Sequence, residues 1–422
     1  MTGSRSHRDS PPRRYFDNAA TSFPKPAAVA EAVRDYMLGV GASAGRGAYA
    51  EALASQRLLD DVRAGLRRVF GARPADHVVL TLNGSDALNI GIKSLVRPGD
   101  HVVTTCMDHN SVLRPLSAIE RRSGTSWTAV EVDRRTTRLR VEDFAAAIRP
   151  DTALAVVNHA SNVTGVLQPL ADLAEVCRAR RVPLLVDAAQ SAGHAPIDFA
   201  GLGLDMLACP GHKGLLGPLG TGVLLVRAGL EERLQTVREG GTGSQSEQPV
   251  QPESMPDKFE AGSHNAPGLA GLLAAIRWIE ERTPDALRRH EAALIGTMAA
   301  GLEGIDGLAW YGPRSVQERV GVFSVRLAGV TPAELSRTLE DDFGILSRSG
   351  LHCAPFAHRM IGSDADGGAT RLSLGPFLEQ DDVAAAIDAL QRIARDAQRR
   401  REPADAARAP GRRTALPVDQ AT

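Results

Sequence analysis

The chain has 422 residues, 43% of them hydrophobic and 23% charged, which is the composition of an ordinary globular protein. Lys and Arg number 49 against 50 Asp and Glu, so the net charge of −1 gives no overall field that would attract nucleic acid or an anionic membrane. A chain of this length exceeds one compact core, and we expect two domains.

The number of cysteines and the length of the apolar runs indicate in which cellular setting the protein is expected to work. The cysteines are too few and too scattered for a disulfide framework or a zinc site, so we expect no bound metal and a reducing, cytoplasmic setting. No apolar run approaches the length of a membrane span, and the Arg-bearing N-terminus lacks the apolar segment of a signal peptide. The four cysteines are Cys106, Cys177, Cys209 and Cys353.

The N-terminal part of the chain predicts a tail, an irregular segment and two helices. Residues 1–14 are predicted to form a disordered tail. The segment that follows, YFDNAATSFPKP, is expected to be ordered but irregular. A helix is predicted over 27–38, followed by a glycine-rich loop, GVGASAGRGAYA, and a long helix to about Phe70.

From His77 onward, short apolar strands alternate with helices such as the one predicted over 86–96. Alternation at this spacing is typical of an α/β protein with a mostly parallel central sheet wrapped by helices. The strands are predicted over 77–82, 101–105, 126–132, 154–158, 183–186, 206–208 and 222–226.

A long polar loop over 238–265 separates this unit from a second one, and loops of that length are usually functional or interfacial. The second unit has strands predicted over 320–325 and 370–373 and a closing helix over 380–395. We therefore expect a smaller α+β C-terminal domain. The predicted division is a large domain over 15–265, with 15–40 packing on the small domain, a small domain over 266–398, and a disordered tail over 399–422.

Two residues in the middle of the chain suggest a specific cofactor. Asp187 ends the buried strand PLLV, and Lys213 lies in a loop rich in glycine and proline. Pyridoxal phosphate needs both groups, because its ring nitrogen stays protonated beside an anion and its aldehyde forms a Schiff base with a lysine amine. At about 4 Å and an effective dielectric near 20, the carboxylate–pyridinium pair is worth roughly 4 kcal/mol. Either residue alone would more often be a turn residue or a solvated lysine.

Other polar residues also follow predicted strands. Gly84 and Ser85 stand at a strand-to-helix junction, where free backbone N–H groups and a hydroxyl can hold an anion, although a plain serine cap is the commoner use. His109 could stack on a pyridine ring or serve as a helix cap. Because ligands bind at the carboxyl ends of parallel strands, His109, Asn162, Asp187 and Lys213 are expected to meet in one cleft.

Among the cysteines, Cys353 is the candidate nucleophile. Cys177 shares a helical face with apolar residues and is expected in the core, and packing is also favoured for Cys106 and Cys209. Cys353 lies in the irregular segment RSGLHCAPFAH, where exposure is expected, and its reactive thiolate depends on nearby positive charge. Help from His352 is not assumed, since neighbours in an extended chain point in opposite directions.

Arg371, which opens the segment RLSLGPF, is a candidate ligand for a substrate carboxylate. Its planar guanidinium can make two parallel hydrogen bonds to a carboxylate, although a surface ion pair is a commoner role for an arginine.

Eight motifs in collinear order resemble the class V aminotransferase-like enzymes of the fold-type I pyridoxal-phosphate superfamily. Within them the chain is similar to the group II cysteine desulfurases and selenocysteine lyases. The resemblance covers roughly Tyr15 to Ala394. The motifs are YFDNAAT, DHNSVLRPL, NHASNVTGVLQP, VDAAQSAGH, GHKGLLGPLGTG, GGTGS, RSGLHCAP and RLSLGPF.

The resemblance implies a role for each matching position. Lys213 would form the Schiff base and carry the proton at the substrate's Cα, Asp187 would pair with the ring nitrogen, and His109 would stack on the ring. Cys353 would attack the substrate's sulfur. The remaining positions are Asn162 and Gln190 on the phenolic-oxygen side, Gly84, Ser85 and His212 at the phosphate with Thr242 from the partner subunit of a homodimer, and Asn18 and Arg371 at the substrate carboxylate.

The expected function is therefore that of a homodimeric, pyridoxal-phosphate-dependent cysteine desulfurase. It would convert L-cysteine to L-alanine and pass persulfide sulfur from Cys353 to an acceptor protein. The alternatives are an aminotransferase, selenocysteine lyase, C–S lyase or epimerase acting on another amino acid, or a catalytically silent binding protein with the same fold.

The sequence departs from the family pattern at three places. Leu378 stands where the family usually has Asn after GPF, which opens the possibility of a missing contact near the carboxylate site and of a substrate other than cysteine. Asp108 replaces the usual Glu before the ring-stacking His, and the phosphate loop reads NGSD over 83–86, where Thr-Glu is commoner.

Overall fold

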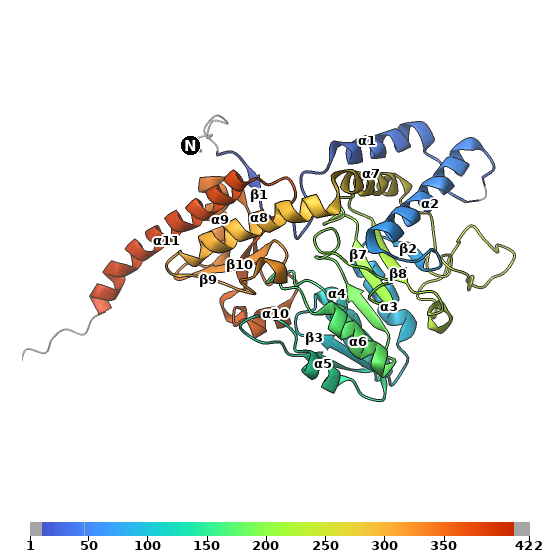
Figure 1. Ribbon diagram of the computed structural model, residues 1–422, viewed down its shortest axis with the longest axis horizontal. Helices are drawn as coiled ribbons and strands as arrows, with labels where there is room; N and C mark the ends of the chain where they lie inside the picture. The colour runs from blue at the N-terminus through green and yellow to red at the C-terminus, as the bar shows by residue number, and fades with distance from the viewer. Residues whose placement is uncertain (1–10, 46, 409–422) are drawn as a thin grey trace, which may run out of the picture.

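The computed structural model describes residues 11–45 and 47–408, and a seven-stranded sheet forms its larger part (Figure 1). The strand order is β2-β8-β7-β6-β5-β3-β4, and only β8 runs against its neighbours. This confirms the predicted mostly parallel α/β sheet. The strands are β2 (His77–Thr81), β3 (His101–Thr105), β4 (Ser126–Val130), β5 (Thr152–Asn158), β6 (Leu184–Asp187), β7 (Met206–Pro210) and β8 (Gly222–Val226).

Helices cover both faces of this sheet, which explains why its strands are apolar on both sides. In β7 the side chains alternate between two cores: Met206 belongs to the one beneath α3 and α4, and Leu207 to the one beneath α2, α6 and α7. The covering helices are α2 (Ala50–Phe70), α3 (Gly84–Leu95), α4 (Asn110–Ser123), α5 (Val141–Ala147), α6 (Leu170–Arg180) and α7 (Ala266–Arg282).

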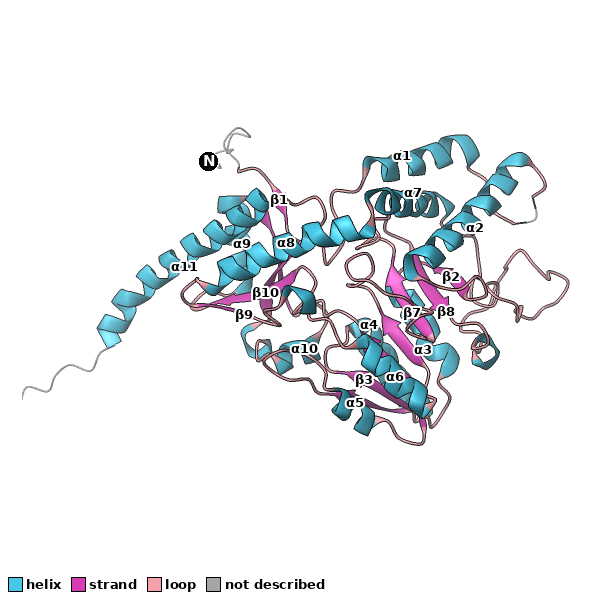
Figure 2. Cartoon of the chain, in the orientation of Figure 1, coloured by secondary structure: helices cyan, strands magenta, loops and turns pink. Residues whose placement is uncertain are grey.

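The smaller unit contains an antiparallel sheet in the order β12-β13-β10-β9, with helices packed against it (Figure 2). Its strands are β9 (Leu308–Trp310), β10 (Val322–Leu327), β12 (Arg348–Gly350) and β13 (Ala369–Ser373), and its helices are α8 (Pro284–Glu303), α9 (Pro332–Phe343) and α11 (Gln380–Arg408). The helix α10 (Pro355–Met360) follows β12, but its side chains Ala357 and Met360 lie in the core of the large sheet.

Short elements complete the chain. A two-stranded parallel pair joins β1 (Arg14–Tyr15) to β11 (Ile345–Leu346). The helix α1 (Ala27–Asp35) continues into the π-helical turn η1 (Tyr36–Val40), and three 3-10 turns are η2 (Glu231–Arg233), η3 (Val316–Glu318) and η4 (Asp364–Asp366). The loop between η2 and α7 protrudes at the right edge of Figure 2 and has neither helix nor strand, as predicted for 238–265.

The residues of the two apolar cores indicate where the boundary between the two units lies. The buried side of α7, including Leu272 and Ile276, belongs to the core of the large sheet, whereas the core of the small sheet begins at Leu294 in α8. Phe16 lies in that second core, but α1 packs against α7, so only the first part of 15–40 joins the small unit. We propose a boundary within α8 rather than at residue 266.

The expected tails need correction where the structure describes them. Arg14 lies in β1, and α11 continues past the expected end near Arg395 to Arg408. Residues 399–408 are therefore helical, as their content of Ala, Arg and Glu favours. The rest of the two predicted tails, 1–10 and 409–422, lies outside the described residues. Within the described part of the chain, every helix is too short or too polar to cross a bilayer.

Candidate active site

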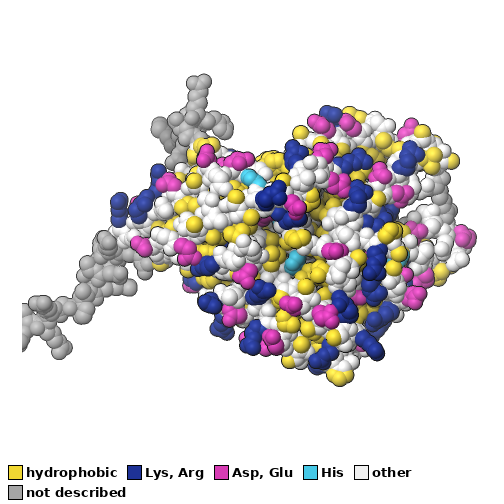
Figure 3. All heavy atoms as spheres, in the orientation of Figure 1, with side chains coloured by type: hydrophobic (Ala, Val, Ile, Leu, Met, Phe, Trp, Pro, Cys, Tyr) yellow, Lys and Arg dark blue, Asp and Glu magenta, His cyan; other side chains and the backbone are white. Residues whose placement is uncertain are grey.

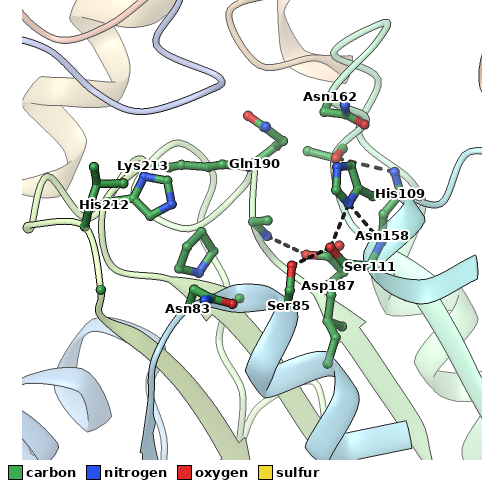
Figure 4. A pocket seen from close by; sticks show the side chains of 17 residues that line it. Asn83, Ser85, His109, Ser111, Asn158, Asn162, Asp187, Gln190, His212 and Lys213 are labelled. Carbon is green, nitrogen blue, oxygen red and sulfur yellow. Dashed lines mark hydrogen bonds between the residues drawn. The ribbon is translucent and has the colours of Figure 1, made fainter. Parts of the chain in front are cut away.

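A cavity of about 410 Å³ opens at the carboxyl ends of β5, β6 and β7, where the parallel-sheet rule places ligands. Figure 4 shows Lys213 and His212 entering from one side, with Ser85, His109 and Asp187 on the other. Eight predicted site residues line this cavity: Gly84, Ser85, His109, Asn162, Asp187, Gln190, His212 and Lys213. Those not among its lining residues are Asn18, Thr242, Cys353 and Arg371.

Lys213 follows β7 in a loop whose backbone is pressed against the turn after β6. A Cβ at Gly214 would lie 2.1 Å from the Ala192 carbonyl oxygen, and one at Gly193 2.2 Å from that of Gly214, so neither position admits a side chain. The loop is thereby fixed beside Asp187. Burial lowers the pKa of the Lys213 amine to about 8, and the Asp187 carboxylate opposes that shift.

Asp187 is the last residue of β6 and is 5% exposed. Its Oδ1 accepts a hydrogen bond of 2.9 Å from the backbone N–H of Ala189, which fixes the carboxylate relative to the turn that follows. Burial raises the pKa of this carboxyl, because the protein interior disfavours the charged form. A cationic partner inside the cavity would favour ionisation.

The carbonyl oxygen of His212, directly before Lys213, accepts hydrogen bonds from four donors in the N-terminal segment. The shortest comes from Lys25 Nζ, at 2.8 Å, and the others come from Thr21 Oγ1, Ser22 Oγ and the Ser22 backbone N–H. Burial lowers the pKa of Lys25 to about 8. A segment nearly two hundred residues away thus holds the lysine loop, a contact that the sequence did not indicate.

His109 caps the N-terminus of α4, and its Nδ1 accepts from the backbone N–H of Ser111 at 3.0 Å. This contact leaves the imidazole proton on Nε2. Burial, together with the positive charge of Lys213, lowers the pKa of His109 to about 4, so the ring is neutral at pH 7. The Ser111 hydroxyl lies 2.9 Å from the same Nδ1 and 2.6 Å from Ser85 Oγ.

The N-terminus of α3 has the features of a phosphate site. The Asn83 side chain accepts from Asp86 N, while the backbone N–H groups of Gly84 and Ser85 have no partner among the described residues. A Cβ at Gly84 would lie 3.0 Å from Pro210 Cδ. The helix dipole and these free donors favour an anion.

Buried polar atoms left unpaired in the cavity also fit a polar cofactor. Asn158 Oδ1 and His212 Nδ1 lack hydrogen-bond partners in the described part of the chain. Together with the lysine, the aspartate and the anion cradle, they fit pyridoxal phosphate, which carries an aldehyde, a ring nitrogen and a phosphate. No cluster of metal-ligating side chains is found among residues 11–45 and 47–408.

Arg371 lies on β13 next to this cavity and is 3% exposed. Its Nη1 donates to the Asn162 carbonyl oxygen at 3.2 Å, its Nη2 forms an ion pair of 3.0 Å with Asp17, and its Nε has no partner. Burial lowers the pKa of this guanidinium. The Asn18 amide is occupied by the chain, since its Nδ2 donates to Tyr15 O and Ser373 O.

Cys353 is exposed, as predicted, whereas the other three cysteines are buried. Its sulfur is near enough to Lys213 and Arg371 to interact electrostatically with both. His352 is 8% exposed, so it and Cys353 do face different surroundings. Cys177 lies in the core with the rest of its helical face, which confirms that prediction.

Two further positions are placed elsewhere. Thr242 lines a separate cavity with Arg63, Glu260 and His264, so its predicted role in the partner's phosphate site remains a prediction. Leu378 is buried in the core of the small unit, and its carbonyl oxygen accepts from His290 at 2.9 Å. Its side chain therefore packs away from the cavity.

Sequence reasoning missed Ser111, Asn158 and Lys25. Ser111 and Asn158 each stand inside a motif quoted for the resemblance, DHNSVLRPL and NHASNVTGVLQP, so position within these motifs was the available signal. For Lys25 the signal was weaker, namely a lysine placed between two prolines.

The sheet, the cavity at its carboxyl edge and the lysine–aspartate pair define the fold-type I class, whose enzymes use pyridoxal phosphate. The model of the family described as aminotransferase class-V matches residues 14–386, and the chain belongs to this family.

Several similar proteins are named as cysteine desulfurases. A probable cysteine desulfurase of Methanothermobacter thermautotrophicus is 32% identical, over 90% of this chain and 94% of the relative. One of Aeropyrum pernix is 33% identical over the same shares of both chains. The solved apo structure of a cysteine desulfurase from Thermococcus onnurineus has a TM-score of 0.83 and 30% identity, and the match covers 94% of this chain and all of that one.

Proposed function

We propose that the protein is a pyridoxal-phosphate-dependent cysteine desulfurase that converts L-cysteine to L-alanine and retains the removed sulfur as a persulfide on Cys353. The observation that carries this proposal is a cavity that brings Lys213 and Asp187 together, with the exposed Cys353 within electrostatic range of Lys213 and Arg371. The named relatives support the same activity.

The cofactor supplies an electron sink for the substrate's Cα when it is bound. Lys213 is the residue that would bind its aldehyde, Asp187 would hold the proton on its ring nitrogen, and the N-terminus of α3 with Ser85 would bind its phosphate. The neutral ring of His109 adds no charge at the cavity wall. Asn162 and Gln190 complete the polar lining on the opposite side.

Arg371 of the small unit would orient the substrate. The unpaired Nε of Arg371 is a buried donor that a carboxylate can satisfy, and a charge-assisted hydrogen bond of this kind is strong. Asn18 acts through the position of β13, because its amide bonds to the Ser373 carbonyl two residues beyond Arg371.

Sulfur transfer balances without an added oxidant or reductant. The Cys353 thiolate attacks the sulfur of the bound cysteine, an S–S bond forms, and the C–S bond breaks with its electron pair passing to the carbon side. The carbon skeleton then takes up protons, one of them from the Lys213 amine, and leaves as alanine. A thiol on an acceptor subsequently takes the outer sulfur of the persulfide.

The protein would work as a homodimer in the reducing cytoplasm, with a sulfur-acceptor protein as its partner. Exposed apolar side chains favour an interface with a second copy of the chain at η1, where Met37 is 64% and Leu38 82% exposed. Thr242 lies outside the cavity of its own chain, which is compatible with a contribution to the other copy.

Replacing the nucleophile tests this proposal. We expect Cys353→Ser to bind the cofactor with an unchanged visible absorption spectrum, and to lose alanine formation from L-cysteine by at least about a hundredfold, because a hydroxyl is a far weaker nucleophile toward sulfur. Alanine and sulfide are measured with and without a thiol acceptor. Cys177→Ser, in the core, serves as the control.

Undiminished alanine formation by Cys353→Ser would refute the assignment of the nucleophile. Conversion of the bound cofactor to its amine form by other amino acids, with no alanine from cysteine, would instead identify an aminotransferase.

A further inference from the structure

The turn that carries Cys353 has an unusual backbone. It joins β12 to α10, and its residues His352 and Cys353 both have positive φ angles, 47° and 56°. Two consecutive residues other than glycine in this region are costly, because the Cβ crowds the backbone. Such a conformation persists only where the surroundings hold it.

Two contacts hold the turn from the large unit. The backbone N–H of Asn110 donates to the Cys353 carbonyl oxygen at 2.8 Å, and Asn162 Nδ2 donates to the His352 carbonyl oxygen at 2.7 Å. Asn110 follows the His109 cap, and Asn162 lines the cavity. Both carbonyl groups of the strained pair are therefore fixed by residues next to the proposed cofactor site.

A buried chain of side chains from β12, α10 and the segment after it also holds the turn. His352 Nε2 lies 3.3 Å from the Arg348 carbonyl oxygen, and His352 Nδ1 lies 3.1 Å from His358 Nε2. His358 Nδ1 in turn lies 2.7 Å from Ser363 Oγ. His358 and Ser363 are fully buried, and His352 nearly so.

The direction of every hydrogen bond in this chain can be assigned. Burial lowers the pKa of His352 to about 2 and that of His358 to about 4, so both rings are neutral at pH 7, with one donor and one acceptor each. The Arg348 carbonyl must accept, so His352 Nε2 donates to it. His352 Nδ1 then accepts from His358 Nε2, and His358 Nδ1 accepts from the Ser363 hydroxyl, whose oxygen also lies 3.4 Å from the His358 carbonyl oxygen.

We propose that His358 is a positioning residue for the nucleophile, which fixes the His352 ring and thereby the turn that carries Cys353. His358 lies outside the motifs that the resemblance rests on, and its ring does not line the cavity. The part of the inference that concerns sulfur transfer rests on the proposed function. The part that concerns the turn does not.

Hydrogen exchange of the full-length protein without cofactor tests the turn directly. His358→Phe keeps a ring but leaves His352 Nδ1 without a donor, so amides of the peptides covering 351–358 and Asn110 should exchange at least about tenfold faster. His358→Gln can still donate to His352, and protection should largely return. His101→Phe is the matched control, since His101 is also fully buried and bonded at both ring nitrogens, to Thr152 and Thr128.

Kinetics of the loaded enzyme provide the second readout. His358→Phe should lower kcat for alanine formation by about tenfold with KM for L-cysteine within about twofold, because a small displacement of the reacting sulfur slows transfer and leaves substrate binding intact. His358→Gln should recover most of kcat. His101→Phe should leave both constants unchanged per folded molecule.

Unchanged exchange in the turn, or equal changes in His101→Phe, would overturn the proposal. If His358→Phe does not fold, Ser363→Ala replaces it as the test, with the same effects in smaller measure. If the wild-type protein forms no alanine from cysteine, the proposed function fails, while the exchange result still decides the role of His358.

Discussion

We expect Lys213 to be reactive because it is buried near a carboxylate. Burial brings the pKa of its amine from an ordinary value of 10.5 to about 8, and Asp187 keeps it from falling further. An amine attacks an aldehyde only in its unprotonated form. The protein thereby holds a usable fraction of free amine near neutral pH, which an exposed lysine does not have.

A pH dependence follows for the protein without cofactor. Below about pH 8 the Lys213 amine is protonated, so its reaction rate with pyridoxal, which lacks the phosphate, should rise as pH increases through 8 and then level off. Stopped-flow absorbance at a series of pH values measures this midpoint. A rate that keeps rising toward pH 10.5 would contradict the burial argument, and Lys213→Ala provides the blank.

Asp187→Asn should retain the cofactor but lose catalysis. A carboxylate–pyridinium pair at about 4 Å and an effective dielectric near 20 is worth roughly 4 kcal/mol, which corresponds to about a thousandfold in rate. The measurement is kcat for alanine formation, with cofactor content checked by absorbance. The control is Asp205→Asn. Asp205 directly precedes β7, at the end of the sheet opposite the cavity, and pairs with Arg227, so its replacement should change kcat less than about twofold. Near-normal turnover by Asp187→Asn would remove that residue from the mechanism.

At the scale of elements, the irregular segment over residues 17–25 connects parts of the site that the sheet alone does not join. Its donors meet on the His212 carbonyl, its Ala19 carbonyl accepts from Gln190 Nε2 at 2.9 Å, and its Asp17 pairs with Arg371. A segment without helix or strand thus fixes the lysine loop, one cavity residue and the proposed carboxylate ligand.

Lys25→Met should weaken cofactor binding by about tenfold, because a hydrogen bond from a charged donor to the His212 carbonyl is lost and is worth roughly 1.5 to 3 kcal/mol. The measurement is the dissociation constant for pyridoxal phosphate, by absorbance titration of the apo protein. Lys93→Met, near the end of α3, is the matched control. An unchanged constant would show that the three remaining donors suffice.

The elements themselves were largely predictable, and their long-range contacts were not. Apolar runs with polar residues at their ends gave the strands of the large sheet, and Asp187 and Lys213 met because both follow strands of that sheet. The contact from Lys25 to His212 and the chain from His352 to Ser363 depend on tertiary packing, which no local pattern encodes. A polar, Arg-rich stretch is typical of a solvated tail, so the sequence did not predict that α11 continues past Arg395.

At the scale of the whole molecule, the candidate site belongs to the large unit and touches the small one through the bond from Arg371 to Asn162, and a second buried arginine helps to join the two units. Arg319 is 3% exposed and donates from Nη1 to the Pro313 carbonyl and from Nη2 to that of Thr164, which lies in the large unit. Its guanidinium lies 3.9 Å from the ring of Phe323, and burial lowers its pKa to about 9. Over the face in Figure 3, positive and negative side chains are intermixed, as the net charge of −1 implies.

Leu38→Glu should separate the proposed homodimer, because it places a charge in the apolar surface of η1, where the leucine is 82% exposed. Light scattering after size-exclusion chromatography measures the mass, and cofactor affinity should fall together with dimer content if Thr242 serves the other copy. Ala309→Glu, on the exposed strand β9 of the small unit, is the control. A wild-type monomer, or a Leu38→Glu dimer, would contradict this placement of the interface.

Under the proposed function, the contacts that hold the Cys353 turn would also affect how sulfur leaves the molecule. The turn follows β12 of the small sheet, and Asn110 and Asn162 of the large unit hold both of its central carbonyls. A movement of β12 away from the large unit would therefore break those bonds and displace Cys353. Under the proposed function, persulfide formation would require these bonds, and transfer to a bulky acceptor would be easier once they are broken.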